Sequence, residues 1–136
     1  MQSHKQKTIE QFNAHYNCAQ AVLLGYGAQF ALPEHTLARL GAGFGGGIVG
    51  TGNMCGAVNA AIMLLGLKYG QKSPNDIDDK RKTVAAIKDF LAELSKNHQS
   101  NNCRDILSEG GAAHPMHSPK CAMLLEEICD YLDSNL

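Results

Sequence analysis

Five cysteines are the residues of this chain best suited to chemistry: Cys18, Cys55, Cys103, Cys121 and Cys129. None of them forms part of a C-x-x-C pair. A cysteine acts as a nucleophile or as a metal ligand in its thiolate form, and the unpaired N–H groups at a helix N-terminus favour that form. Cysteines at the starts of helices are therefore the candidates for chemistry.

Three of the cysteines stand at or near expected helix starts. A glycine-rich stretch ends at Cys55, and an apolar helical run follows it. Cys103 comes after two asparagines, which are good N-cap residues. Ser118 and Pro119 suit the N-cap and the first position of a helix, which places Cys121 at its third position. The helix-terminus field predicts that the low-pKa thiol is Cys55 or Cys121.

The other two cysteines, Cys18 and Cys129, fall inside helical patterns. A free cysteine in such a position is often just a small buried hydrophobic residue. Without the field of a helix terminus, the pKa of Cys129 is expected to stay near or above its ordinary value.

The glycine-rich stretch over residues 41–56 matches the dinucleotide-binding pattern G-x-G-x-x-G twice. A helix rather than a strand is expected before it, and it lacks the lysine of a P-loop, so we reject both nucleotide-binding interpretations. Two interpretations stay open. The stretch is either a tight connector or a loop whose backbone N–H groups face the Cys55 sulfur, an anion or a cluster. In the second case Gly52 and Gly56 are the candidate cofactor-binding residues.

A second candidate site lies in the segment HPMHSPKC, where His114, His117 and Cys121 are close enough in sequence to share a metal. The spacing matches no known zinc pattern well, so we favour solvated loop histidines. His15 and His98 are expected at the surface or at the edge of the core.

The elements that must position these residues are all expected to be helices. Apolar residues recur at spacings of three and four over residues 7–30, and similar patterns predict helices over 33–44, 56–70 and 73–98. Two further helices are expected to begin at Cys103 and Ser118. No strand alternation is present. We predict a single all-α domain over residues 1–136, a bundle of five or six helices in which the segment 56–70 is central and the most buried.

Composition excludes several classes of partner. The chain has 12 basic and 13 acidic residues and a net charge of −1, which gives no electrostatic footprint for nucleic acid or for an anionic membrane. The polar N-terminus does not resemble a signal peptide, and the longest apolar stretch is too short to span a bilayer. We expect a cytoplasmic protein, in which thiols are kept reduced and serve redox or metal chemistry.

The order and context of four cysteines resemble those of a known family. The segments are YNCAQAVL, the glycine-rich run into MCGAVNAAIMLLGLKYG, NCRDIL and the helix start around Cys121. Together they resemble the small proteins classed as redox-active and named for the pattern C_GCAxxG_C_C. Ala60 stands where that pattern has its last glycine. Cys129 is extra to the pattern, which implies that it is structural. The resemblance implies a helical redox-active protein, in which four cysteines converge as the catalytic residues: Cys18, Cys55, Cys103 and Cys121.

Three hypotheses for function remain open at this stage. In the first, a low-pKa thiol attacks a disulfide or a peroxide, and a neighbouring cysteine resolves the intermediate. In the second, the same four thiolates hold a metal ion or an iron–sulfur cluster that transfers electrons. In the third, the cysteines only pack, and the protein is a helical ligand-binding or partner-binding module. The redox partner or small-molecule substrate is unknown, a cofactor is either absent or one of these metal groups, and a homodimer is left open.

Overall fold

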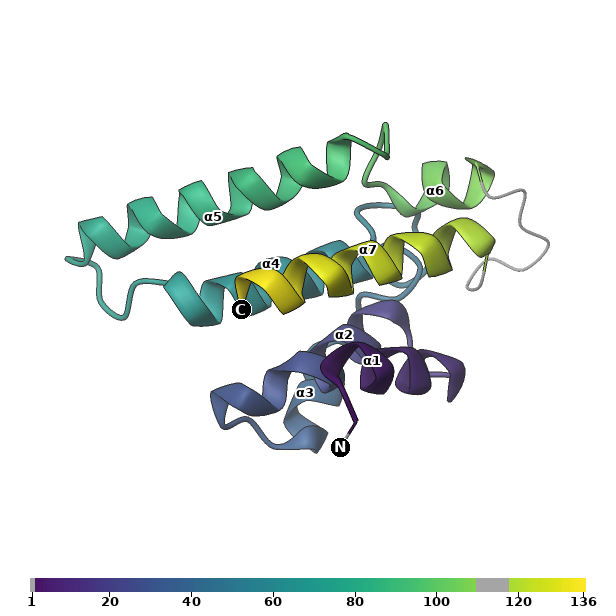
Figure 1. The fold of residues 1–136 in the computed structure, drawn as a ribbon. Coiled ribbons are helices and arrows are strands. Elements are labelled where there is room, and N and C mark those ends of the chain that lie inside the picture. Colours follow the sequence, from purple (N-terminus) through teal and green to yellow (C-terminus); the bar gives the residue numbers. More distant parts are fainter. Residues whose placement is uncertain (1, 110–117) are drawn as a thin grey trace.

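Seven α-helices and one 3₁₀ turn make up the computed structural model, which describes residues 2–109 and 118–136 (Figure 1). This part of the chain contains no strand, and its sole β-type pairing is an isolated bridge between Met54 and Asn102. The all-α prediction is therefore confirmed. In chain order the elements are α1 (His4–Asn13), α2 (Cys18–Tyr26), η1 (Gly27–Phe30), α3 (Glu34–Leu40), α4 (Gly56–Tyr69), α5 (Ile77–Ser95), α6 (Cys103–Glu109) and α7 (Pro119–Asn135).

The helix expected over residues 7–30 is in fact two helices. Residues 14–17 break it, and His15 has a left-handed φ of 78°. Asn17 then caps α2: its side chain accepts a hydrogen bond from the Gln20 N–H, while the Gln20 side chain accepts one from the Asn17 N–H. This break raises the number of helices in the described residues above the five or six expected, and it places Cys18 at the start of a helix.

Helices α2 and α4 form the centre of the core. Every residue of α2 except Cys18 and Gln20 is buried, whereas about half of α4 is exposed or half-buried. The expectation that residues 56–70 are the most buried is therefore wrong, although α4 does occupy a central place. The reason is that α2 is covered from several sides, because α1, α3 and α4 all pack against it.

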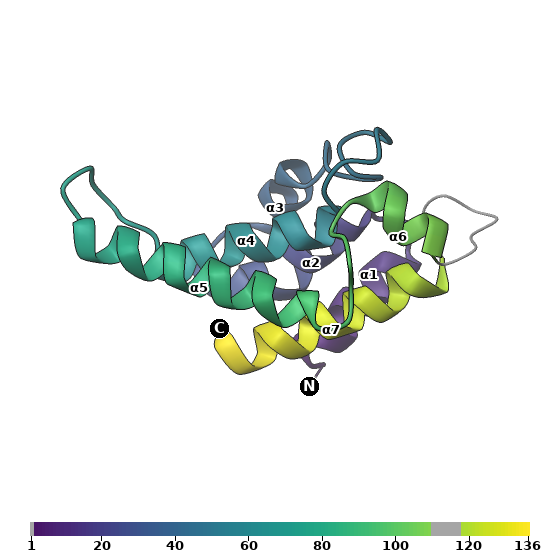
Figure 2. The same cartoon turned by 90° about the horizontal axis from the view of Figure 1, so that it is seen from above.

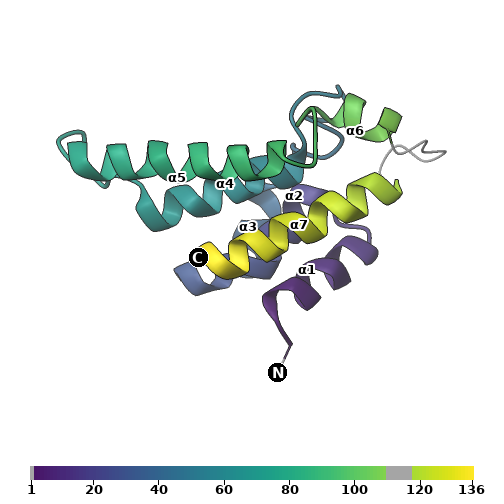
Figure 3. The ribbon, with the colours of Figure 1, turned by 45° about the horizontal axis from the view of Figure 1, so that its top comes forward.

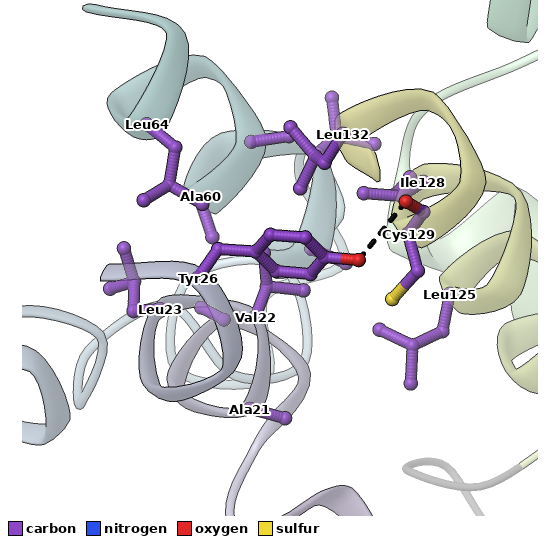
Figure 4. Close-up of a cluster of buried hydrophobic side chains, with 14 of the residues drawn as sticks. Ala21, Val22, Leu23, Tyr26, Ala60, Leu64, Leu125, Ile128, Cys129 and Leu132 are labelled. Carbon is purple, nitrogen blue, oxygen red and sulfur yellow. Dashed lines mark hydrogen bonds between the residues drawn. The ribbon is translucent and has the colours of Figure 1, made fainter. Parts of the chain in front are cut away.

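Helix α7 runs across the other elements and closes the core. It packs against α1, α4 and α5 (Figures 1 and 3). The Tyr26 hydroxyl of α2 donates hydrogen bonds to the backbone carbonyl of Cys129 at 3.0 Å and to Asp133 Oδ1 at 2.8 Å. Figure 4 shows the Tyr26 ring inserted among the apolar side chains of α2, α4 and α7. The C-terminal helix is thus tied to the centre of the molecule.

Helix α5 lies alongside α4, and together they form an arm that extends beyond the other helices (Figures 1 and 2). The buried residues of α5 are Phe90 and Leu94, both in its C-terminal half. Ile77 and Val84, in its N-terminal half, are about half exposed. In the described residues no helix is both long and apolar enough to cross a membrane.

The connection over residues 41–55 brings the start of α4 beside the start of α6 (Figure 2). The Cys55 N–H donates to the Asn101 carbonyl, and the Cys103 N–H donates to the Asn53 carbonyl, each at 2.7 Å. These two bonds flank the Met54–Asn102 bridge. Two segments about 50 residues apart in sequence are therefore held together at one end of the bundle.

Candidate functional site

One small cavity is lined by four of the five cysteines: Cys18, Cys55, Cys103 and Cys121. They come from α2, the N-cap of α4, α6 and α7. The remaining lining residues are Gly46 and three apolar residues, Phe12, Ala57 and Ile106. The cavity volume is about 20 Å³, which is room for roughly one water molecule. The structure therefore brings together all four cysteines that were expected to converge.

Cys18 is the first residue of α2, and its sulfur also faces the start of α4. Backbone N–H groups of Ala19, Gly56 and Ala57 donate to this sulfur. A Cβ atom at Gly56 would lie only 2.9 Å from Cys18 Sγ and 2.6 Å from the Phe44 carbonyl oxygen, so a residue without a side chain is required there. The sulfur of Cys18 thus sits where the N-termini of two helices meet.

The sulfur of Cys55 is the largest influence on the acidity of Cys18. Its thiol donates a hydrogen bond to the Cys18 sulfur, which stabilises the Cys18 thiolate. Together with the backbone N–H groups, this bond outweighs burial and lowers the pKa of Cys18 to about 7. Cys18 is therefore partly ionised at neutral pH, although its sequence pattern placed it inside a helix.

Cys55 is correspondingly a poor acid. It is the N-cap of α4, as expected, yet its hydrogen bond to Cys18, its burial and the negative charge of Cys18 raise its pKa well above the ordinary value. Within this pair the lower pKa therefore belongs to Cys18 rather than to Cys55, where the sequence placed it. The helix N-terminus does lower the pKa of Cys55 through the N–H groups of Ala57 and Val58, but the neighbouring sulfur has the greater effect.

Cys103 and Cys121 complete the lining of the cavity. Cys103, the first residue of α6, is buried, and its pKa is raised by burial and by the nearby sulfurs of Cys121 and Cys18. Cys121 stands at the third position of α7, after Ser118 as N-cap and Pro119, as the sequence predicts. Whether Cys121 is among the first thiols to react stays a prediction.

Ser118 has a second role that its cap pattern did not reveal. Its hydroxyl accepts a hydrogen bond from the Cys121 N–H and donates one to Cys121 Sγ, both at 3.1 Å. The residue is almost fully buried. One hydroxyl group thus starts α7 and fixes the position of a cysteine sulfur.

In the glycine-rich connection, several backbone N–H groups donate hydrogen bonds to carbonyls of the same connection. The N–H groups of Val49, Gly50, Gly52 and Asn53 donate to the carbonyls of Gly43, Gly45, Gly46 and Gly47, respectively. Gly52 has a φ of 78°, and its carbonyl accepts hydrogen bonds from the backbone N–H and the Nε of Arg104. The connection thereby anchors α6 next to the cavity. A cofactor-binding role for Gly52 and Gly56 stays a prediction.

Cys129 lies away from the cavity. It is fully buried within α7, where its backbone carbonyl accepts the Tyr26 hydroxyl, as Figure 4 shows. Burial raises its pKa, in agreement with the expectation of a value near or above the ordinary one. It therefore provides an internal reference for the four cavity cysteines.

The histidines do not build a metal site in the part of the chain that the structure describes. Within residues 2–109 and 118–136, no three side chains among His, Cys, Asp and Glu are arranged to hold a metal ion. His114 and His117 lie outside the described residues. His98, expected at the surface or core edge, is instead 4% exposed, and its Nε2 contacts Glu127 of α7. It links the end of α5 to α7.

Comparison with known proteins assigns the chain to a family. No curated protein and no solved structure matches the chain. One family model, described as "Putative redox-active protein (C_GCAxxG_C_C)", matches residues 16–134 and so covers all four cavity cysteines. The match extends over most of the sequence, from just before α2 to the last turn of α7. The chain therefore belongs to the C_GCAxxG_C_C family of redox-active proteins.

Proposed function

We propose that this redox-active protein is a thiol–disulfide oxidoreductase in which Cys18 is the nucleophile and Cys55 the resolving cysteine. The observation that supports this most strongly is the hydrogen bond from the Cys55 thiol to the Cys18 sulfur at the meeting point of two helix N-termini. The pair shares one proton near neutral pH. One member is poised as a thiolate, while the other is kept as a thiol.

The reaction oxidises the pair and reduces a substrate disulfide. The Cys18 thiolate attacks one sulfur of the substrate R–S–S–R, so that a Cys18–S–S–R bond forms and one RS⁻ leaves. The Cys55 thiol then loses its proton to the departing or surrounding base and attacks Cys18 Sγ. This forms the Cys18–Cys55 disulfide and releases the second RS⁻. Two electrons pass to the substrate, and two RSH are produced after protonation.

The first step makes the second easier. The hydrogen bond and the negative charge of Cys18 are among the causes that raise the pKa of Cys55. Both disappear when Cys18 enters the mixed disulfide, because its sulfur then carries no charge. Cys55 therefore becomes a stronger acid at the moment when its thiolate is needed. This sequence keeps the resolving thiol inactive until substrate is bound.

The other hypotheses receive less support from the described residues. A four-thiolate metal or cluster site needs the sulfurs arranged around one centre, and no such arrangement is present in this part of the chain. A purely packing role does not account for a pKa of about 7 at Cys18. We include a cytoplasmic location in the proposal, since a reducing compartment returns the pair to its active dithiol form.

Oxidised glutathione tests the proposal directly. The fully reduced protein is exposed to it briefly, the remaining thiols are alkylated, and the Cys18 peptide is identified by mass spectrometry. The test uses the variant Cys103→Ala, Cys121→Ala, in which no other cavity thiol can react with Cys18. We expect a Cys18–Cys55 disulfide in this variant and a stable Cys18–glutathione adduct when Cys55→Ala is added to it. Cys129→Ala, added in the same way, is the matched control and should leave the Cys18–Cys55 disulfide in place. An unmodified Cys18, or an adduct that persists at Cys18 while Cys55 is present, would overturn the assignment.

A further inference from the structure

Two cavity cysteines have no part in the exchange between Cys18 and Cys55. Cys103 and Cys121 line the same cavity, yet they come from α6 and α7 rather than from the two central helices. A cavity of about 20 Å³ leaves no space between the four residues for anything larger than about one water molecule. These two residues therefore lie within the same small site as the first pair.

The electrostatic neighbours of the sulfurs connect the two pairs. Cys55 is influenced by Cys18, whereas Cys103 is influenced by Cys121 and, less strongly, by Cys18. Cys103 thus lies near its own partner and near Cys18 as well. The four cysteines, taken in the order Cys55, Cys18, Cys103 and Cys121, are called the row.

Contacts with the surrounding chain hold the cysteines of the row in place. The two hydrogen bonds around the Met54–Asn102 bridge fix the start of α6 beside the start of α4. A Cβ atom at Gly47 would lie 2.7 Å from the Cβ of Cys103, so the glycine-rich connection packs closely on that residue. The Ser118 hydroxyl donates a hydrogen bond to the sulfur of Cys121. The positions of Cys103 and Cys121 therefore depend on these contacts with the surrounding chain.

We propose that Cys103 and Cys121 form a second dithiol, which takes over the disulfide from Cys18 and Cys55 by exchange within the molecule. This inference rests on the proposed function, because it requires the Cys18–Cys55 disulfide as its starting point. The protein then contains two dithiols in series. A substrate disulfide is reduced at one end of the row, and the reductant that regenerates the protein, itself a dithiol, reacts at the other end.

The exchange balances without any further reactant. The thiolate of Cys103 attacks Cys18 Sγ, the Cys18–Cys55 bond breaks, and Cys55 takes up the proton that Cys103 lost. The Cys121 thiol then releases its proton to solvent and its sulfur attacks Cys103 Sγ, the Cys18–Cys103 bond breaks, and Cys18 leaves as the thiolate. Cys18 and Cys55 are reduced by two electrons, and Cys103 and Cys121 are oxidised by two. The low pKa of Cys18 favours this direction, since the more acidic thiol is the better leaving group.

The intermediate of the exchange can be trapped. In the double variant Cys55→Ala, Cys121→Ala the two outer partners are removed, so mild oxidation with oxidised glutathione should give mostly a Cys18–Cys103 disulfide. The native protein, oxidised to completion, should hold two disulfides, Cys18–Cys55 and Cys103–Cys121, with Cys129 as the remaining thiol. After partial oxidation, transfer between the pairs should proceed at a rate independent of protein concentration. Cys129→Ala serves as the control throughout.

The outcomes separate this inference from the proposed function. If Cys18–Cys55 forms while Cys103 and Cys121 stay reduced, the relay is overturned and the first pair stands. If Cys18–Cys55 does not form at all, both fail. Circular dichroism of each variant checks the fold, and Cys103→Ala provides a second route: it should retain Cys18–Cys55 formation but lose transfer to Cys121. Transfer that persists in Cys103→Ala would also overturn the proposed order.

Discussion

At the scale of single residues, the acidity of Cys18 comes from three sources: the start of α2, the start of α4 and the thiol of Cys55. The start of its own helix provides one N–H group, the start of α4 provides two, and Cys55 provides a thiol. The apolar walls of the cavity act in the opposite sense, because burial disfavours the thiolate. Since the thiol of Cys55 is the largest of these influences, the two residues function as one titrating unit.

Removing the Cys55 thiol should therefore make Cys18 a weaker acid. In Cys55→Ala we expect the midpoint of the alkylation profile of Cys18 to rise from about 7 toward the ordinary value of 9.0, by about one pH unit or more. The measurement is a pH series of iodoacetamide labelling with site-resolved mass spectrometry. Cys129→Ala should leave the Cys18 midpoint unchanged, and an unchanged midpoint in Cys55→Ala would contradict the proposed hydrogen bond.

The same pair makes stability depend on pH. The pKa of Cys18 is lower in the folded protein than in the unfolded chain, so the unfolded state binds more protons between pH 7 and 9 and folding is stabilised as the pH rises through that window. Under reducing conditions, the native protein should gain up to about 2 kcal/mol relative to Cys18→Ala between these limits. The raised pKa of Cys55 has the opposite effect on stability, because the stabilisation that it contributes is lost as the pH rises above 9. Urea unfolding of both proteins at pH 6.5 and 8.5 measures how the free energy of unfolding changes with pH. An equal change in the native protein and in Cys18→Ala would contradict the prediction.

The sequence contained part of this information. Asn17 and Gln20 have the spacing of a capping box, a signal that would have placed Cys18 at a helix start. The pKa order of Cys18 and Cys55 could not be predicted in that way. It depends on which sulfur receives the hydrogen bond, and this follows from the packing of α2 against α4 rather than from either segment by itself.

At the scale of the elements, glycine has opposite roles in the two central helices. Gly25 of α2 faces α1, and a Cβ atom there would lie 1.8 Å from Thr8 Oγ1. Gly66 of α4 has no atom within 4 Å of the equivalent position. The first glycine permits two helices to approach closely, whereas the second only weakens its own helix.

These two positions give a matched pair of substitutions. Gly25→Ala should destabilise the protein by roughly 1–3 kcal/mol, because α1 and α2 must separate or Thr8 must shift. Gly66→Ala should stabilise it by about 0.5–1 kcal/mol, because alanine reduces the freedom of the unfolded chain and fits the helix without contact. Thermal unfolding followed by circular dichroism measures both. Shifts of the same sign in the two variants would contradict the packing described for α1 and α2.

Periodicity predicted most helices because each has an apolar face that repeats every three or four residues. It failed over residues 7–30, where two helices in succession keep nearly the same period across the break at residues 14–17. The burial of His98 was also missed, because its partner Glu127 lies on another helix. Contacts between elements determine such features, and the pattern within a single element does not reveal them.

At the scale of the whole molecule, the site and the arm differ in how well the helices that carry them are packed. Cys18 and Cys55 stand at the starts of α2 and α4, the two helices that provide most of the buried core. The N-terminal half of α5, by contrast, lies on the arm and buries none of its side chains fully. The positions of the nucleophile and the resolving cysteine are therefore fixed by the best-packed part of the protein, as a reactive pair requires.

This division predicts uneven protection against hydrogen exchange. Local opening needs little free energy where few apolar side chains become exposed, so amides of residues 80–88 should exchange at least about tenfold faster than those of residues 22–26 in α2. Within α5 itself, amides near Phe90 and Leu94 should be slower than those near Val84, since the first two side chains are buried and the third is about half exposed. The two halves of one helix thus serve as mutual controls.

Hydrogen exchange followed by mass spectrometry on the reduced protein measures these differences. Uniform protection along α5 would contradict the prediction and would indicate that another molecule, such as a second copy of this chain, covers the arm in solution.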